Sequence, residues 1–158
     1  RKPFVLYETS CPSTWVKFGG GCYNFEPVVE KLTFEESRIH CKQKVNTSDV
    51  LTIESETENH FVLEQLLSSG FLHRTIWLGM YFNVDTDSMA WVDGSPTDYT
   101  NWAGKGPDTK LLTPDTCVTT RLVDGVWHLS TCGEQLGFIC KTISGRCVKQ
   151  KMYRATDL

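Results

Sequence analysis

The chain has 158 residues, a formal net charge of −3 and 40% hydrophobic residues. This length and apolar content predict a single folded domain with tails and exclude a wholly disordered chain. The mild acidity argues against a nucleic-acid-binding protein, which usually carries a basic surplus, and no apolar run approaches the roughly 18–20 residues that span a bilayer.

Seven cysteines are the most informative part of the composition. They lack the Cys-x-x-Cys spacing of common zinc sites, and the four histidines form no His-x-x-x-His pair, so we expect no metal centre. Disulfide bonds in an extracellular, oxidising compartment are the better interpretation, and the glycosylation sequon at Asn46 agrees with it. One thiol is left over, and counting alone leaves roughly 100 three-bridge patterns open.

The first half of the chain predicts a hairpin and two helices. Residues 1–10 read as a linker or an N-terminal edge strand, and residues 16–25 as a hairpin with a glycine turn, with Cys11 and Cys22 on either side. Capping boxes at residues 33–36 and 55–58 each predict a helix, the first to near Lys44 and the second stopped by Gly70. Phe34, Arg38 and Cys41 share one face of the first helix, and the second carries an apolar stripe that is read as core packing.

The second half predicts strands around a long loop. Residues 75–81 and 117–123 are strand-like, and Asp124-Gly125 predicts a two-residue turn into a returning strand over residues 126–129. Residues 83–116 read as a loop, of a length that is often functional. A closing strand is expected at residues 137–141. Because both helices precede most of the strands, the fold class is α+β.

Several short motifs occur in an order and spacing that resemble the C-type lectin-like domain family. They are Trp77-Leu78-Gly79-Met80, Trp91-Val92-Asp93-Gly94-Ser95, Tyr99-Thr100-Asn101-Trp102 and the set Cys117-Val118, Trp127, Cys132 and Phe138-Ile139-Cys140. The resemblance covers residues 11–141 and implies that family's fold, with two helices, antiparallel sheets, a long loop region and three disulfides. Residues 142–158 then read as a basic linker or tail. The whole looks like one module of a multi-domain endocytic receptor of the mannose receptor type, a group that includes a dendritic-cell receptor.

The same resemblance implies a disulfide pairing, Cys41 with Cys140, Cys117 with Cys132, and Cys11 with Cys22 as in the family's long form. Closing the loop of about 100 residues between Cys41 and Cys140 would contribute on the order of 4–5 kcal/mol in the chain-entropy model. Cys147 is left unpaired: it is free, joins another chain in a disulfide-linked dimer, or pairs with a neighbouring domain.

The family's calcium site is degenerate in this sequence. Sugar-binding members take calcium ligands from a loop triplet, from a Glu before the loop-closing cysteine and from an Asn-Asp pair after the strand tryptophan. The equivalent positions here are Gly106, Asp108, Asp115, His128 and Leu129, so only two carboxylates remain where calcium wants six to eight oxygens. Calcium and calcium-dependent sugar binding are therefore not expected. Asp85, Asp87 and Asp98 leave a structural cation site open, and a cis bond before Pro107, as in the family, is a further open alternative.

The leading functional hypothesis is an extracellular, calcium-independent ligand-binding module of an immune cell-surface receptor. We expect a protein or another non-sugar ligand, with neighbouring receptor domains as further partners and no nucleic acid. The candidate surface is loop 83–116 with the hairpin around Asp124, where Tyr99, Trp102, Lys105, Asp108 and Asp115 are the candidate ligand-binding residues. The alternatives are a secreted location and a calcium-dependent lectin with a degenerate site. An enzyme is not expected, because no catalytic motif is present.

Overall fold

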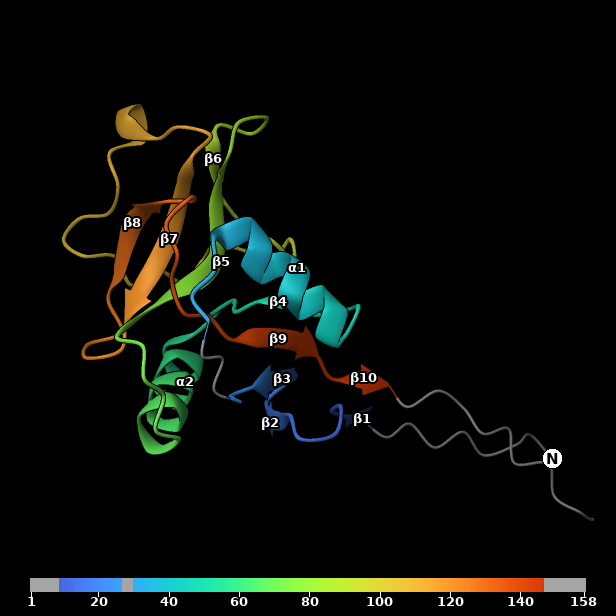
Figure 1. The fold of residues 1–158 in the computed structure, drawn as a ribbon. Helices are drawn as coiled ribbons and strands as arrows, with labels where there is room; N and C mark the ends of the chain where they lie inside the picture. The colour runs from blue at the N-terminus through green and yellow to red at the C-terminus, as the bar shows by residue number, and fades with distance from the viewer. Residues whose placement is uncertain (1–8, 27–29, 147–158) are drawn as a thin grey trace, which may run out of the picture.

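The structure, a computed structural model, describes residues 9–26 and 30–146. Within these ranges the chain forms two α-helices, one short 3-10 helix and ten β-strands (Figure 1). In chain order they are β1 (Thr9–Ser10), β2 (Val16–Phe18), β3 (Gly21–Asn24), α1 (Phe34–Lys44), β4 (Asp49–Val50), α2 (Glu56–Ser68), β5 (Thr75–Asn83), β6 (Ser88–Trp91), η1 (Thr109–Leu111), β7 (Thr116–Arg121), β8 (Trp127–Thr131), β9 (Cys140–Ile143) and β10 (Gly145–Arg146). None of the helices in these ranges is long and apolar enough to cross a membrane.

The strands pair antiparallel in three sheets. One four-stranded sheet has the order β2-β3-β9-β4 and the other has the order β6-β5-β7-β8, while β1 and β10 form a two-stranded pair at the side of the molecule (Figure 1). This α+β arrangement confirms the predicted fold class. Strand pairing continues past Lys141 to Arg146, which pairs with Thr9, so the folded part reaches beyond residue 141, where we expected the domain to end.

The first helix forms as its sequence predicts. The Thr33 hydroxyl accepts the Glu36 N–H at 3.3 Å, and the Glu36 carboxylate accepts the Thr33 N–H at 3.0 Å, which completes the capping box. Phe34 and Cys41 are buried on the inner face, and Arg38 between them pairs with the Asp49 carboxylate of β4 at 3.1 Å.

The second helix begins at the predicted place, but its capping box is only half formed. Ser55 Oγ accepts the Glu58 N–H at 3.1 Å, whereas the Glu58 carboxylate does not return to the Ser55 backbone. It accepts instead from the Glu54 N–H, the Tyr23 hydroxyl and the Lys141 ammonium, because burial next to these donors offers it stronger partners. At the other end Gly70 adopts a φ of +72°, which ends the helix as predicted.

Two loop predictions were wrong in detail. Residues 83–116 are not a continuous loop, since β6 pairs with β5 and leaves residues 92–115 as the loop proper. The β7–β8 connection is also longer than the two residues Asp124-Gly125, because β7 ends at Arg121 and β8 begins at Trp127. Leu122 causes this widening: its side chain enters the core, and its N–H donates to the Arg74 carbonyl at 2.9 Å.

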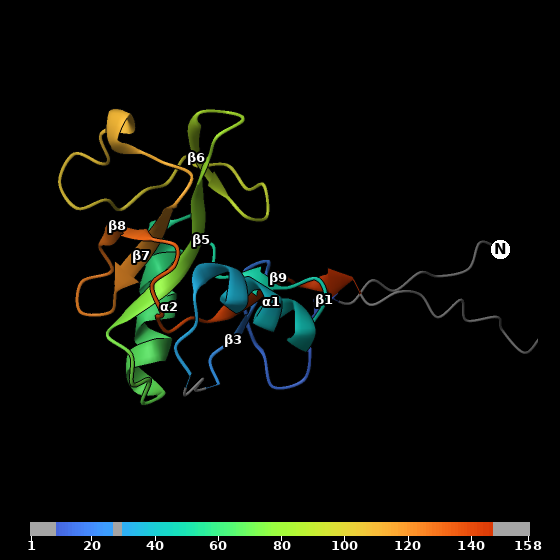
Figure 2. The same ribbon diagram turned by 45° about the horizontal axis from the view of Figure 1, so that its top comes forward.

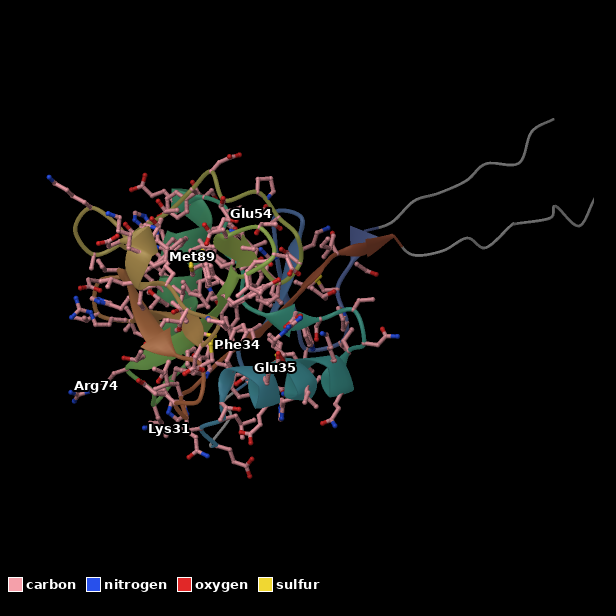
Figure 3. All side chains as sticks on the ribbon, turned by 90° about the horizontal axis from the view of Figure 1, so that it is seen from above. Lys31, Phe34, Glu35, Glu54, Arg74 and Met89 are labelled. Atoms are coloured by element: carbon pink, nitrogen blue, oxygen red, sulfur yellow. A yellow bond between two sulfur atoms is a disulfide. The ribbon has the colours of Figure 1, made fainter. Side chains whose placement is uncertain are left out.

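The interior is filled by the inward faces of both large sheets and both helices. Trp77 and Trp127 are completely buried, and the Trp77 indole N–H donates to the Leu32 carbonyl at 2.9 Å. Figure 3 shows Phe34 directed into this interior, whereas Lys31 and Arg74 point outward. All three expected disulfides are confirmed. They are Cys11–Cys22, Cys41–Cys140 and Cys117–Cys132.

Candidate functional site

The candidate ligand-binding surface is the loop of residues 92–115, which we call the long loop. Together with η1 it lies beside the sheet of β6, β5, β7 and β8, at the end of the molecule opposite the β1–β10 pair (Figures 1 and 2). This position leaves the long loop open to a partner while the two ends of the described chain lie elsewhere.

Trp127 of β8 is the centre of the packing beneath the long loop. The rings of Trp91, Tyr99 and Trp102 each meet it edge to face, with centroid distances of 5.4, 5.7 and 5.6 Å. Trp91 and Trp127 are buried, and Tyr99 and Trp102 are half-buried. Trp91 and Trp127 thus support the loop from below and offer little free surface.

The backbone of the long loop is hydrogen-bonded to β8 on both sides of Trp102. The Trp127 N–H donates to the Asn101 carbonyl at 2.8 Å, and the Ala103 N–H donates to the Trp127 carbonyl at 3.0 Å. The Asn101 amide group also donates to the Gly125 carbonyl at 2.7 Å. These bonds fix residues 101–103 as an extra segment beside β8.

Three of the five candidate ligand-binding residues, Tyr99, Trp102 and Lys105, differ in accessibility. Lys105 is exposed, and none of the salt bridges found in the described ranges involves it. Tyr99 and Trp102 expose only part of their rings. Burial raises the pKa of the Tyr99 phenol, and the Glu56 carboxylate raises it further, so the phenol stays a neutral hydrogen-bonding group. A partner would therefore meet one free ammonium and two aromatic edges.

The two carboxylates of the degenerate calcium site serve the local backbone or face solvent. Asp108 Oδ1 accepts the Lys110 N–H at 3.0 Å and so caps η1. Asp115 is exposed, and its carbonyl accepts the Cys132 N–H at 3.1 Å. Gly106 has a φ of +92°, and a Cβ there would lie 3.3 Å from the Trp102 ring, so the position favours glycine.

The remaining two positions of that site lie on β8 and offer no suitable donor. Leu129 has no oxygen in its side chain and is 40% exposed, and His128 is half-buried with an unpartnered Nε2 atom. The donor set does not fit a calcium ion, which takes six to eight oxygen ligands.

The geometry around Pro107 and around three further aspartates bears on the two alternatives that the sequence left open. The peptide bond before Pro107 is trans, as are the other peptide bonds of the ranges described, so the cis alternative was wrong. Asp85, Asp87 and Asp98 are exposed, and across residues 9–26 and 30–146 no group of three or more acidic, histidine or cysteine side chains is placed to hold a metal ion.

The remaining predicted residues lie outside residues 92–115 in the sequence. Asn46 is exposed in the turn after α1. Asp124 forms an exposed ion pair with Arg121 at 2.8 Å. Cys147 lies outside the described residues.

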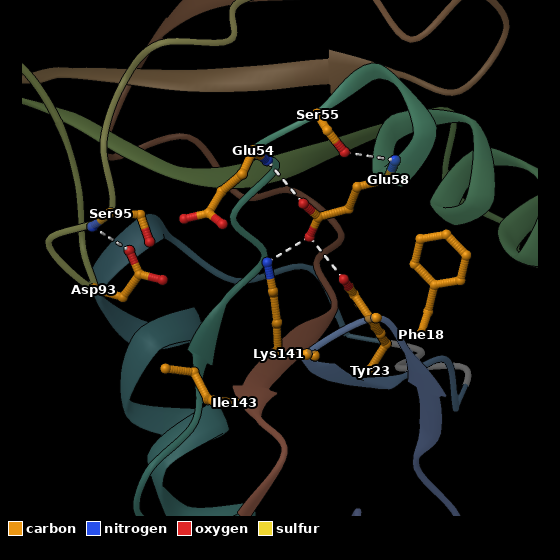
Figure 4. Close-up of a pocket in the computed structure, with 12 residues that line it drawn as sticks. Phe18, Tyr23, Glu54, Ser55, Glu58, Asp93, Ser95, Lys141 and Ile143 are labelled. Atoms are coloured by element: carbon orange, nitrogen blue, oxygen red, sulfur yellow. Dashed lines mark hydrogen bonds and ion pairs between the residues drawn. The ribbon is translucent and has the colours of Figure 1, made fainter.

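A second feature, which the sequence reasoning missed, is a pocket built around Glu58. Its cavity measures about 510 Å³ and lies between the β2–β3 turn, the start of α2, β9 and the start of the long loop (Figure 4). Tyr23 donates its hydroxyl proton to Glu58 Oε1 at 2.7 Å, and the Lys141 ammonium donates to the same oxygen. The only signal in the sequence was a charged residue, Lys141, directly after the apolar run of the closing strand.

This buried network predicts a pH-dependent contribution to stability. Burial raises the pKa of the Tyr23 phenol far above its ordinary value, and the hydrogen bond and negative charge of Glu58 add to the shift. Above about pH 10 the unfolded chain ionises this phenol while the folded chain keeps it protonated, so the stabilisation is present below pH 10 and is lost as the pH rises further.

We therefore expect the wild-type chain to be more stable than Tyr23→Phe by about 1 kcal/mol at neutral pH. This difference should shrink as the pH rises above about 10. Urea denaturation of both chains across this range measures it, and a difference that stayed constant up to about pH 11 would contradict the assignment.

Comparison with known sequences gives consistent matches. The profile of the family described as "Lectin C-type domain" matches residues 30–142. The human "Secretory phospholipase A2 receptor" is 41% identical over 139 residues, which are 88% of this chain and 9% of that protein. The rat "C-type mannose receptor 2" is 32% identical over 145 residues, 88% of this chain and 10% of that protein. The chain thus spans about a tenth of the length of these relatives.

Solved structures give the same result for the fold. Human lithostathine, at 23% identity, superposes with a TM-score of 0.71 over 85% of this chain and 91% of the other. The carbohydrate-recognition domain of the mouse scavenger receptor C-type lectin, at 27% identity, has a TM-score of 0.67 over 86% of this chain and all of the other.

Proposed function

Because the chain belongs to the C-type lectin domain family, we propose that it is an extracellular, calcium-independent protein-binding module of a cell-surface receptor. The family is one of non-enzymatic domains, in agreement with the sequence. Its relatives are receptors by name, and three disulfides with an exposed sequon at Asn46 suit an oxidising, extracellular location.

The donor chemistry of the long loop carries the calcium-independent part of the proposal. Gly106 and Leu129 offer no side-chain ligand, and Asp108 already caps η1. Two carboxylates without further ligands give at best a millimolar calcium site. The long loop takes its position instead from packing on Trp127 and from the hydrogen bonds of residues 101–103.

A protein ligand suits what the long loop exposes. Lys105 and Lys110 are exposed cations, and Leu111, the neighbour of Lys110 in the chain, exposes 73% of its surface. Aromatic side chains are enriched at protein interfaces, and accessible cations attract partners of complementary charge. The name of the human relative supplies a first probe, a secretory phospholipase A2.

The test measures binding of the chain to an immobilised secretory phospholipase A2 in the presence of a chelator. We expect binding to persist, and Lys105→Ala to weaken it by about fivefold through the loss of one accessible charge. Lys31→Ala is the matched control, since Lys31 is an exposed lysine outside the long loop, and it should leave the affinity unchanged.

Each negative result has a distinct meaning. No binding, or equal binding by Lys105→Ala, contradicts this partner or this surface. Binding to a glycan array that a chelator abolishes contradicts the proposed function and supports the alternative, a calcium-dependent lectin.

A further inference from the structure

The pocket around Glu58 has the composition of a binding site for a cationic side chain. It is open to solvent and combines charged, hydroxyl and aromatic walls (Figure 4). The lining residues with side chains are Phe18, Tyr23, Glu54, Ser55, Glu58, Asp93, Ser95, Lys141 and Ile143.

The one cation of this lining is already neutralised. Lys141 Nζ donates to Glu58 Oε1, to the Thr52 carbonyl at 3.0 Å and to the Thr52 hydroxyl at 3.1 Å. These three acceptors use all three of its N–H bonds. The Lys141 side chain is only 12% exposed, so its charge is held inside the wall and does not repel a cation at the mouth.

Two carboxylates at the mouth have no such compensation. Among the ion pairs of the described ranges, none involves Glu54 or Asp93. Figure 4 shows both side chains on the same side of Lys141, close to Ser95. The Asp93 carboxylate is held in place, since it accepts the Ser95 N–H at 2.9 Å and the Thr52 hydroxyl at 3.2 Å. With Glu58 balanced by Lys141, the pocket keeps a net charge of −2.

Phe18 lies across the pocket from Glu54 and Asp93 and supplies flat aromatic surface (Figure 4). Phe18 is stacked on Phe61 with ring centroids 4.0 Å apart, which fixes its orientation, whereas Tyr23 is only 2% exposed and already has the Lys141 ammonium over its ring. Ile143 exposes 75% of its surface at the rim. A guanidinium group pairs with carboxylates, stacks on aromatic rings and brings an aliphatic stem, whereas a lysine ammonium is more strongly hydrated.

We propose that this pocket binds an arginine side chain of a partner protein, with the guanidinium between Glu54 and Asp93 and the aliphatic stem toward Phe18. The site is separate from the anchors of the long loop and does not depend on the ligand proposed for them. It would add a second, charge-selective contact to the module.

A blocked peptide, Gly-Gly-Arg-Gly-Gly, tests the proposal by titration into the full chain, followed through backbone amide shifts in NMR spectra. The same peptide with neutral citrulline in place of arginine is the ligand control. We expect saturable shifts at Glu54, Asp93 and Ser95 with the arginine peptide only. The double variant Glu54→Gln/Asp93→Asn should weaken binding by about fivefold or more, because it removes both charges and keeps the shapes.

Glu64→Gln is the matched protein control, because it removes an exposed carboxylate of α2 outside the pocket and should not change the affinity. The unperturbed amide shifts of each variant report its folding. Equal binding of the citrulline peptide, equal binding by the double variant, shifts spread over all acidic surfaces, or no saturable shift would each overturn the proposal.

Discussion

Replacing Cys41 and Cys140 together by alanine is expected to lower the free energy of unfolding by about 4–5 kcal/mol. The bridge joins α1 to β9 across a sequence separation of 99 residues, so it removes much of the freedom of the unfolded chain. It also lies in the buried cluster with Phe34, Trp77 and Phe138, which helps to hold the first helix against the sheet. Such a loss is a large fraction of the stability of an ordinary domain. Urea denaturation of the oxidised chains measures it.

The short bridge is the control for this prediction. Cys11 and Cys22 are only 11 residues apart, so the double alanine variant at these positions should lose about 3 kcal/mol or less in the same model. Its loss should free only the hairpin of β2 and β3. Equal losses for both pairs, or a larger loss for the short bridge, would contradict the role given to Cys41–Cys140.

Gly79→Ala should destabilise the domain by about 3 kcal/mol, through overpacking in the middle of β5. A Cβ at this position would lie 2.6 Å from the Val50 carbonyl oxygen and 2.9 Å from a methyl carbon of Val92. Backbone atoms cannot move aside as a flexible side chain does. The Gly79 N–H also donates to the Leu51 carbonyl at 2.7 Å, so a shift of β5 would weaken the link between the two large sheets.

Gly133→Ala is the matched control for this change, because no atom lies within 4 Å of a Cβ at Gly133. Neither glycine has a positive φ, so the comparison isolates the steric term. We expect Gly133→Ala to change the free energy of unfolding by less than about 0.5 kcal/mol. If Gly79→Ala changed the free energy of unfolding as little as Gly133→Ala does, β4 and β5 would not be in the close contact that this prediction requires.

Local signals predicted the elements well where one interaction decided the outcome. The Thr33 capping box and the Gly70 stop depend on neighbouring residues, and both formed as predicted. The disulfide pairing came from the family resemblance, which the relatives confirm. Glu58 does not complete the second capping box, because it bonds to Tyr23 and Lys141 instead. These partners are 35 and 83 residues away in sequence, so no local pattern could predict them.

What the sequence says about the candidate sites is limited for the same reason. The sequence identified the aromatic residues of the long loop, but not that Tyr99 and Trp102 turn their rings onto Trp127. The pocket around Glu58 could not be predicted, since four separate segments meet there and none carries a motif for it.

The central claim is that the domain folds and binds its partner without calcium, and thermal unfolding across a calcium titration tests it most directly. An ion that binds the native state must raise the melting temperature as its concentration exceeds the dissociation constant. We predict a melting temperature that stays within about 1 °C between excess chelator and about 1 mM calcium, because the long loop lacks the oxygen ligands. A rise of several degrees below about 1 mM calcium would contradict the claim.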